Sequence, residues 1–95
     1  MIKADEARAL TTGYIDGMEQ EGIKAAHEVI HAIEAVIRNN ASEGYTCSEV
    51  FITRLYDSDN GITRRAYIRE LRQMLFSNGF DVCYNDESKI LRIQW

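Results

Sequence analysis

The first 40 residues constrain the fold most, because an apolar stripe with helical spacing runs through almost their whole length. Good helix formers fill residues 4–10, and Asp5 and Glu6 lie where the helix dipole favours acids. A helix of roughly 36 residues would be about 54 Å long. A compact domain of this size has a radius of gyration of only about 12 Å. An unbroken helix would therefore extend well beyond its own domain.

Two arrangements would account for such an overhang. Either the helix breaks near Gly22 and folds back, or its first half packs against a second copy of the chain. Gly13, Gly17 and Gly22 permit both, because glycine weakens a helix by ~1 kcal/mol relative to alanine and allows close approach of backbones. We favour self-association, with residues 1–22 as an oligomerisation segment. The predicted interface residues are Ala7, Leu10, Tyr14 and Met18.

The remaining residues predict a strand, a second helix and a β-hairpin. Residues 45–55 are rich in β-branched and aromatic side chains, and the loop at 57–61 can cap a helix over 63–78. Gly79 is typical of a residue that ends a helix in the left-handed conformation. Alternating apolar residues then predict strands on both sides of a turn at 85–88. We expect a single α+β domain, residues 1–95, in which a three-stranded sheet packs on the helices.

Composition and charge exclude several classes of protein. No apolar run approaches the roughly 20 residues of a membrane-spanning helix. The acids near the N-terminus differ from the basic start of a signal peptide, so we expect a cytoplasmic protein with reduced Cys47 and Cys83 and no membrane partner. The net charge is −4, from 11 basic and 15 acidic residues, and this argues against a general nucleic-acid binder.

Residues 27–31, His-Glu-Val-Ile-His, match the H-E-x-x-H motif of zinc enzymes. In that motif two histidines one helical turn apart bind zinc, and the glutamate is the general base. Glu34 lies on the same helical face as His27 and His31 and would complete a set of three ligands. This face lies opposite the apolar stripe, so we interpret it as a solvated polar face. We predict no cofactor and no enzymatic activity, and keep a zinc site as the alternative.

A second candidate surface is the basic face of the helix over 63–78, formed by Arg64, Arg65, Arg69 and Arg72. Arginine clusters bind phosphates and acidic partners, so we predict that a ligand or partner contacts this face. A basic helix followed by a hairpin partly resembles a winged-helix domain. That fold needs a further short helix before the recognition helix, and the sequence indicates only a loop there. A nucleic-acid-binding regulator is therefore an alternative to a protein partner or a small anionic ligand.

Three short segments carry a resemblance to known proteins: residues 4–8 (Ala-Asp-Glu-Ala-Arg), 79–82 (Gly-Phe-Asp-Val) and 91–95 (Leu-Arg-Ile-Gln-Trp). With these segments, the chain resembles a set of small uncharacterised tailed-bacteriophage proteins. The resemblance implies a phage origin and a helix–strand–helix–hairpin fold, and it implies no catalytic or binding residue. We expect a homo-oligomeric binding protein that acts in the host cytoplasm on a host protein, a phage protein or, in counter-defence, a defence-system component. A minor virion component is a further alternative.

Overall fold

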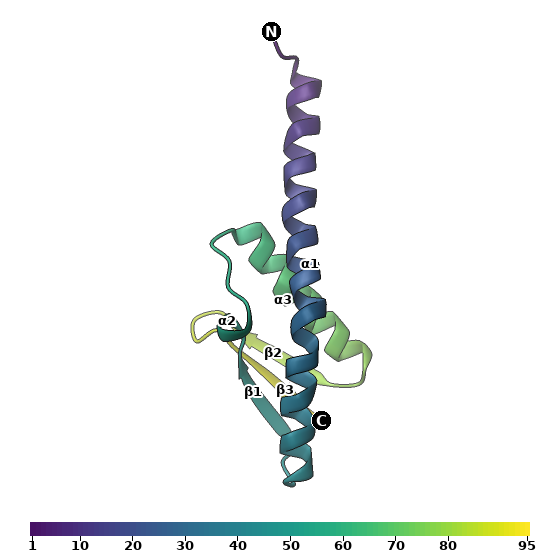
Figure 1. Ribbon diagram of the computed structural model, residues 1–95, viewed down its shortest axis with the longest axis vertical. Helices are drawn as coiled ribbons and strands as arrows, with labels where there is room; N and C mark the ends of the chain where they lie inside the picture. The colour runs from purple at the N-terminus through teal and green to yellow at the C-terminus, as the bar shows by residue number, and fades with distance from the viewer.

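The computed structural model describes all 95 residues and shows a long helix with the other elements gathered around its second half (Figure 1). The elements are α1 (Ala4–Ser42), β1 (Cys47–Phe51), α2 (Ile52–Leu55), α3 (Gly61–Ser77), β2 (Asp81–Asn85) and β3 (Ile90–Gln94). The α+β fold predicted from the sequence, with a long N-terminal helix and a three-stranded sheet, is confirmed.

α1 is one continuous helix of 39 residues, and it determines the shape of the molecule. The principal extents are 64 × 24 × 18 Å, and the Cα radius of gyration is 16.4 Å. The N-terminal part of α1, before Met18, projects past every other element (Figure 1). The alternative of a break near Gly22 is wrong, since the helix runs through this residue. Neither α1 nor any other helix combines the length and the apolar character needed to cross a membrane.

Gly22 allows α1 and α3 to cross at close range. A methyl group on its Cα would overlap the carbonyl oxygen of Thr63 and would lie 2.8 Å from the amide nitrogen of Tyr67 and 2.9 Å from Cβ of Ala66. Beside this point, Oγ1 of the fully buried Thr63 donates a hydrogen bond to the carbonyl oxygen of Met18 (3.0 Å). Two backbones therefore approach each other here, and this accounts for a glycine inside a continuous helix.

Local signals determine both ends of α3. Oδ1 of Asn60 accepts a hydrogen bond from the amide nitrogen of Ile62 (2.9 Å), so Asn60 caps the helix as the loop composition predicts. The helix begins at residue 61 rather than 63. At its other end Gly79 has a φ of +91°, and the amide of Phe80 donates to the carbonyl oxygen of Leu75 (3.2 Å). Gly79 thus has the left-handed conformation that the sequence predicts.

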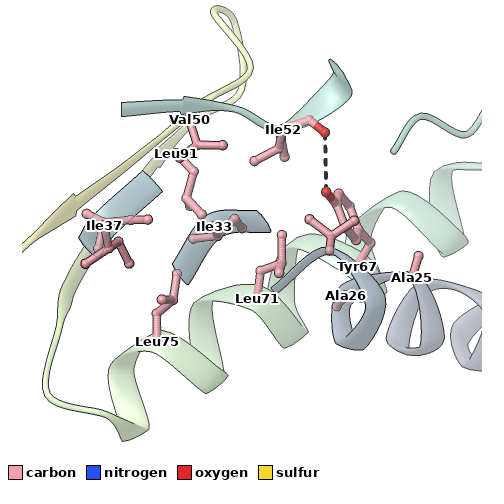
Figure 2. Packing of buried hydrophobic residues seen from close by; sticks show 12 residues of the cluster. Ala25, Ala26, Ile33, Ile37, Val50, Ile52, Tyr67, Leu71, Leu75 and Leu91 are labelled. Carbon is pink, nitrogen blue, oxygen red and sulfur yellow. Dashed lines mark hydrogen bonds between the residues drawn. The ribbon is translucent and has the colours of Figure 1, made fainter. Parts of the chain in front are cut away.

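A four-residue helix, α2, follows β1 directly, so the expected strand over 45–55 shortens to Cys47–Phe51. The β-branched residues around Ile52 were consistent with a longer strand, but Ile52 turns into the core and is 1% exposed. The hydroxyl of Tyr67 donates a hydrogen bond to the carbonyl oxygen of Ile52 (3.3 Å, Figure 2), and the ring centroids of Tyr56 and Tyr67 are 5.0 Å apart. These contacts hold α2 against α3. The prediction that the strand continues through residues 52–55 is therefore wrong.

The sheet is antiparallel, with the strand order β1-β3-β2. In the central strand β3, Leu91 pairs with Val50 of β1 and with Tyr84 of β2, and Leu91 is completely buried. Figure 2 shows Leu91 and Val50 pointing toward Ile33 of α1. The buried cluster between the sheet and the two long helices consists of Ala25, Ala26, Val29, Ile33, Ile37, Val50, Ile52, Tyr67, Leu71, Leu75, Leu91 and Ile93.

Tyr67 provides a pH-dependent test of this core. Burial raises the pKa of its phenol well above the ordinary value, and negative charge on Tyr56 or Tyr84 would raise it further. The folded protein therefore keeps this proton at an alkaline pH at which the unfolded chain has lost it. We expect the free energy of unfolding to fall by up to about 1.4 kcal/mol per pH unit above about pH 10.

Urea titrations at several alkaline pH values measure this decline. Tyr67→Phe should remove most of it, because phenylalanine has no proton to lose. Tyr45→Phe, at a tyrosine that is 59% exposed, is the control and should leave the decline in place. A wild-type stability that stays level in alkaline solution would contradict the assignment.

Candidate functional site

α3 separates two kinds of side chain on its opposite faces. Thr63, Tyr67 and Leu71 face α1 and the core, and each is at most 1% exposed. Arg65, Arg69 and Arg72 recur at helical spacing on the exposed face, and none of the three forms an ion pair within the protein. A groove of about 700 Å³ lies between this face and β2. It is lined by Arg65, Ile68, Arg69, Arg72, Gln73, Phe76, Val82, Tyr84 and Asp86.

The groove combines an apolar lining with a basic border. Ile68 of α3 and Val82 and Tyr84 of β2 are partly buried and pack against the core cluster. The hydroxyl oxygen of Tyr84 is buried and has no hydrogen-bond partner in the protein. Burial raises the pKa of this phenol and outweighs the opposite effect of Lys89. An anionic ligand with a flat or apolar part would find complementary groups on both sides of this groove.

Arg64 lies apart from the other three arginines. Its Nη2 donates a hydrogen bond to the carbonyl oxygen of Ser58 (2.6 Å) and lies 3.8 Å from the carboxylate of Asp57. Both partners belong to the loop between α2 and α3, so Arg64 holds that loop in place. The sequence analysis assigns all four arginines to one basic face of the helix. The structure brings together Arg65, Arg69 and Arg72 and assigns Arg64 to a structural contact.

The order of elements along the chain is helix, strand, helix, helix, hairpin, with the central strand last in sequence. The same order occurs in winged-helix domains, in which the helix before the hairpin is the recognition helix. α3 is the helix before the hairpin here, and the four-residue α2 precedes it. The prediction that only a loop precedes this helix is therefore wrong. The likeness concerns topology, so the functional argument depends on the residues of α3.

The turn between β2 and β3 differs from α3 in charge. Oδ1 of Asn85 accepts hydrogen bonds from the amides of Glu87 (2.9 Å) and Ser88 (3.2 Å), which fixes a tight turn. Lys89 has a φ of +59° and its Nζ lies 3.2 Å from the carboxylate of Asp86. With two acids and one lysine, the turn has no surplus of positive charge. α3 is therefore the basic element of the site.

The H-E-x-x-H residues lie apart from any third metal-ligating side chain in the structure. Nε2 of His27 lies 3.3 Å from the carboxylate of Glu70 on α3, and the His27 side chain is 58% exposed. His31 and Glu34 are exposed on α1. The structure contains no group of three or more His, Cys, Asp or Glu side chains that could hold a metal ion. His27 instead links α1 to α3 beside their crossing.

The predicted interface residues on α1 fall into two groups. Ala7 and Leu10 lie in the part of α1 that projects past the other elements, and Leu10 is 68% exposed. The hydroxyl of Tyr14 accepts a hydrogen bond from Nδ2 of Asn60 (3.1 Å), and the carbonyl oxygen of Met18 contacts α3 through Thr63, as described above. The ring of Tyr14 remains 58% exposed. The apolar stripe of α1 is thus covered from Met18 onward and uncovered before it.

Sequence reasoning missed the apolar half of the groove. Phe76 is 73% exposed and follows Arg72 by one helical turn. An aromatic residue on an otherwise polar helical face was a usable signal for a binding surface. Val82 and Tyr84 had no such signal, because their pattern predicts a core strand and only the structure places that strand beside α3. No protein-family model, curated protein or solved structure matches the chain.

Proposed function

We propose that the protein is a non-enzymatic nucleic-acid-binding protein that acts as a homo-oligomer and presents α3 to a duplex. The observation that supports this most is the row of three unpaired arginines, Arg65, Arg69 and Arg72, on the exposed face of the helix that precedes a hairpin. Unpaired guanidinium groups on an exposed helix are suited to phosphates and to the edges of guanine.

The dimensions of α3 are consistent with this role. The row from Arg65 to Arg72 covers eight residues, and its seven steps amount to about 10 Å of helix. The major groove of B-form DNA is about 12 Å wide and accepts one α-helix. Gln73 lies beside the row, and glutamine pairs with the edge of adenine. The row would therefore contact phosphates on the groove walls as well as bases on its floor.

The distribution of charge supports one particular orientation. α3 carries four arginines and one acid, whereas residues 1–40 hold seven acids and four bases. The negative net charge of −4 is therefore concentrated on α1, away from the exposed face of α3. Phosphates would be attracted to α3 and repelled from the acidic part of α1. This arrangement reconciles a nucleic-acid-binding surface with an acidic chain.

Fluorescence anisotropy with labelled duplex DNA at several salt concentrations tests the proposal. If the three arginines each neutralise about one phosphate, the logarithm of affinity should fall with the logarithm of salt with a slope of about −2.7. Arg69→Ala should weaken binding about tenfold or more and reduce the slope by about 1. Arg92→Ala removes an exposed arginine from β3 outside the groove and should change little. Absence of binding to duplex DNA and RNA at low salt would reject the proposal.

The exposed Phe76 favours a second candidate, an acidic protein partner that binds the same groove. Aromatic and arginine side chains together are typical of protein interfaces, whereas a phosphate backbone gains little from Phe76. For such a partner, a host or phage protein, Phe76→Ala and Arg69→Ala should both weaken capture from lysate. For a duplex, Phe76→Ala should leave affinity within about twofold of wild type, because the phosphate contacts remain. The two variants therefore separate the two candidates.

A further inference from the structure

Residues 4–17 form the part of α1 that projects past the other elements. Of their side chains, only Tyr14 forms a hydrogen bond with a residue outside α1. All of these residues are exposed, and in Figure 1 this segment projects away from the other elements. It contains Thr11, Thr12, Gly13 and Gly17, all of which are poor helix formers. A helical segment of this length and composition has little stability in water by itself. Packing against another apolar surface would stabilise this segment.

Its apolar side has the spacing of a two-stranded coiled coil. Ala7, Leu10, Tyr14 and Gly17 follow one another at intervals of three, four and three residues, which are the a and d positions of a heptad repeat. Large side chains lie in the middle of this row and small ones at its ends. A Cβ at Gly17 would meet no atom within 4 Å, so nothing within the chain requires a glycine there. An alanine opposite a glycine would let two such helices approach closely at both ends.

We propose that residues 4–17 pair with the same segment of a second copy of the chain in an antiparallel arrangement. The alignment that places Leu10 opposite Tyr14 of the second copy also places Ala7 opposite Gly17. Each a position then faces a d position of the second copy, as in an antiparallel coiled coil. Two chains related by a two-fold axis make these contacts twice, so the interface closes and the assembly ends at two.

Charge selects the antiparallel direction. Lys3 and Glu21 continue the row of a and d positions by one step at its two ends. A parallel pair would place the two Glu21 side chains opposite each other, and like charges repel. The antiparallel alignment places Lys3 of one chain opposite Glu21 of the other, once on each side of the two-fold axis.

Light scattering tests the pairing. The mass should be twice the 10.9 kDa of one chain, and Leu10→Asp should reduce it to that of one chain. Thr12→Asp introduces the same charge two residues further on, outside the apolar row, and should leave the two-chain mass unchanged. Both positions are exposed and outside the domain core, so both variants should fold. A single-chain mass for the wild type, or a mass above two chains, would overturn the proposal.

Cysteine crosslinking tests the direction. In a background of Cys47→Ser and Cys83→Ser, the double variant Leu10→Cys with Tyr14→Cys should form crosslinked dimers with oxidised glutathione. Leu10→Cys alone should crosslink much less efficiently, because residue 10 of one chain is offset by four residues, about 6 Å along the helix, from residue 10 of the other. Efficient crosslinking of Leu10→Cys alone would overturn the antiparallel arrangement. This inference deepens the proposed homo-oligomer, and neither experiment contains nucleic acid, so its failure is distinct from a failure of duplex binding.

Discussion

Gly22→Ala should destabilise the protein by about 3 kcal/mol, because the added methyl group overlaps backbone atoms of α3 rather than a movable side chain. The carbonyl of Thr63 and the amide of Tyr67 are fixed within α3, so α1 and α3 must separate to make room. Separation would also disturb the hydrogen bond between Thr63 and Met18, whose donor is completely buried. Urea denaturation measures the loss.

Gly13→Ala is the matched control for this substitution. It makes the same chemical change in the same helix, but a Cβ at Gly13 meets no atom within 4 Å. It should raise stability by up to about 1 kcal/mol, because alanine favours the helix. If both variants were equally stable, the close crossing at Gly22 would not be a feature of the protein in solution.

Leu71→Ala should cost about 2–5 kcal/mol, since it opens a cavity in the centre of the core. Leu71 is completely buried, and Figure 2 shows its side chain pointing from α3 toward α1. The surrounding residues are held by two helices and a sheet, so they cannot collapse fully into the space. The loss should appear as a lower urea midpoint with little change in the slope of the transition.

Phe76→Ala removes a larger side chain from the same helix, but from the face that lines the groove. Because Phe76 is 73% exposed, this variant should lose less than about 1 kcal/mol. A loss comparable to that of Leu71→Ala would mean that the groove face of α3 is covered in the folded protein. The pair of variants therefore tests which face of α3 belongs to the core and which is free for a ligand.

Much of the fold could be predicted from local patterns. Helical spacing gives α1 and α3, Asn60 and Gly79 mark the ends of α3, and alternation gives the hairpin. α2 escaped prediction, because four residues are too few for a helical period and Ile52 favours strands by its type. Its conformation depends on the distant Tyr67, which binds the carbonyl of Ile52. Tertiary contact outweighs local preference at this point.

The candidate site could be predicted only in part for the same reason. Helical spacing is enough to place Arg65, Arg69 and Arg72 on one face of α3. Arg64 does not join this face because it binds the carbonyl oxygen of Ser58, and helical spacing does not show where Ser58 lies. The sequence makes a helix break at Gly22 conceivable, because nothing near Gly22 along the chain shows that Thr63 and Tyr67 lie against it. Contacts between distant segments decided each of these outcomes.

The strand order has a consequence for the way the protein is made. β1 and β2 do not pair with each other, since each forms its hydrogen bonds with β3, which is the last strand along the chain. Cys47 and Phe51 of β1 therefore have no strand to pair with until Gln94 and Ile90 of β3 have been synthesised. While the ribosome is still adding these residues, the apolar face of α1 has no sheet to cover it. The sheet can therefore form only after β3 has been synthesised, and distant pairings of this kind slow folding.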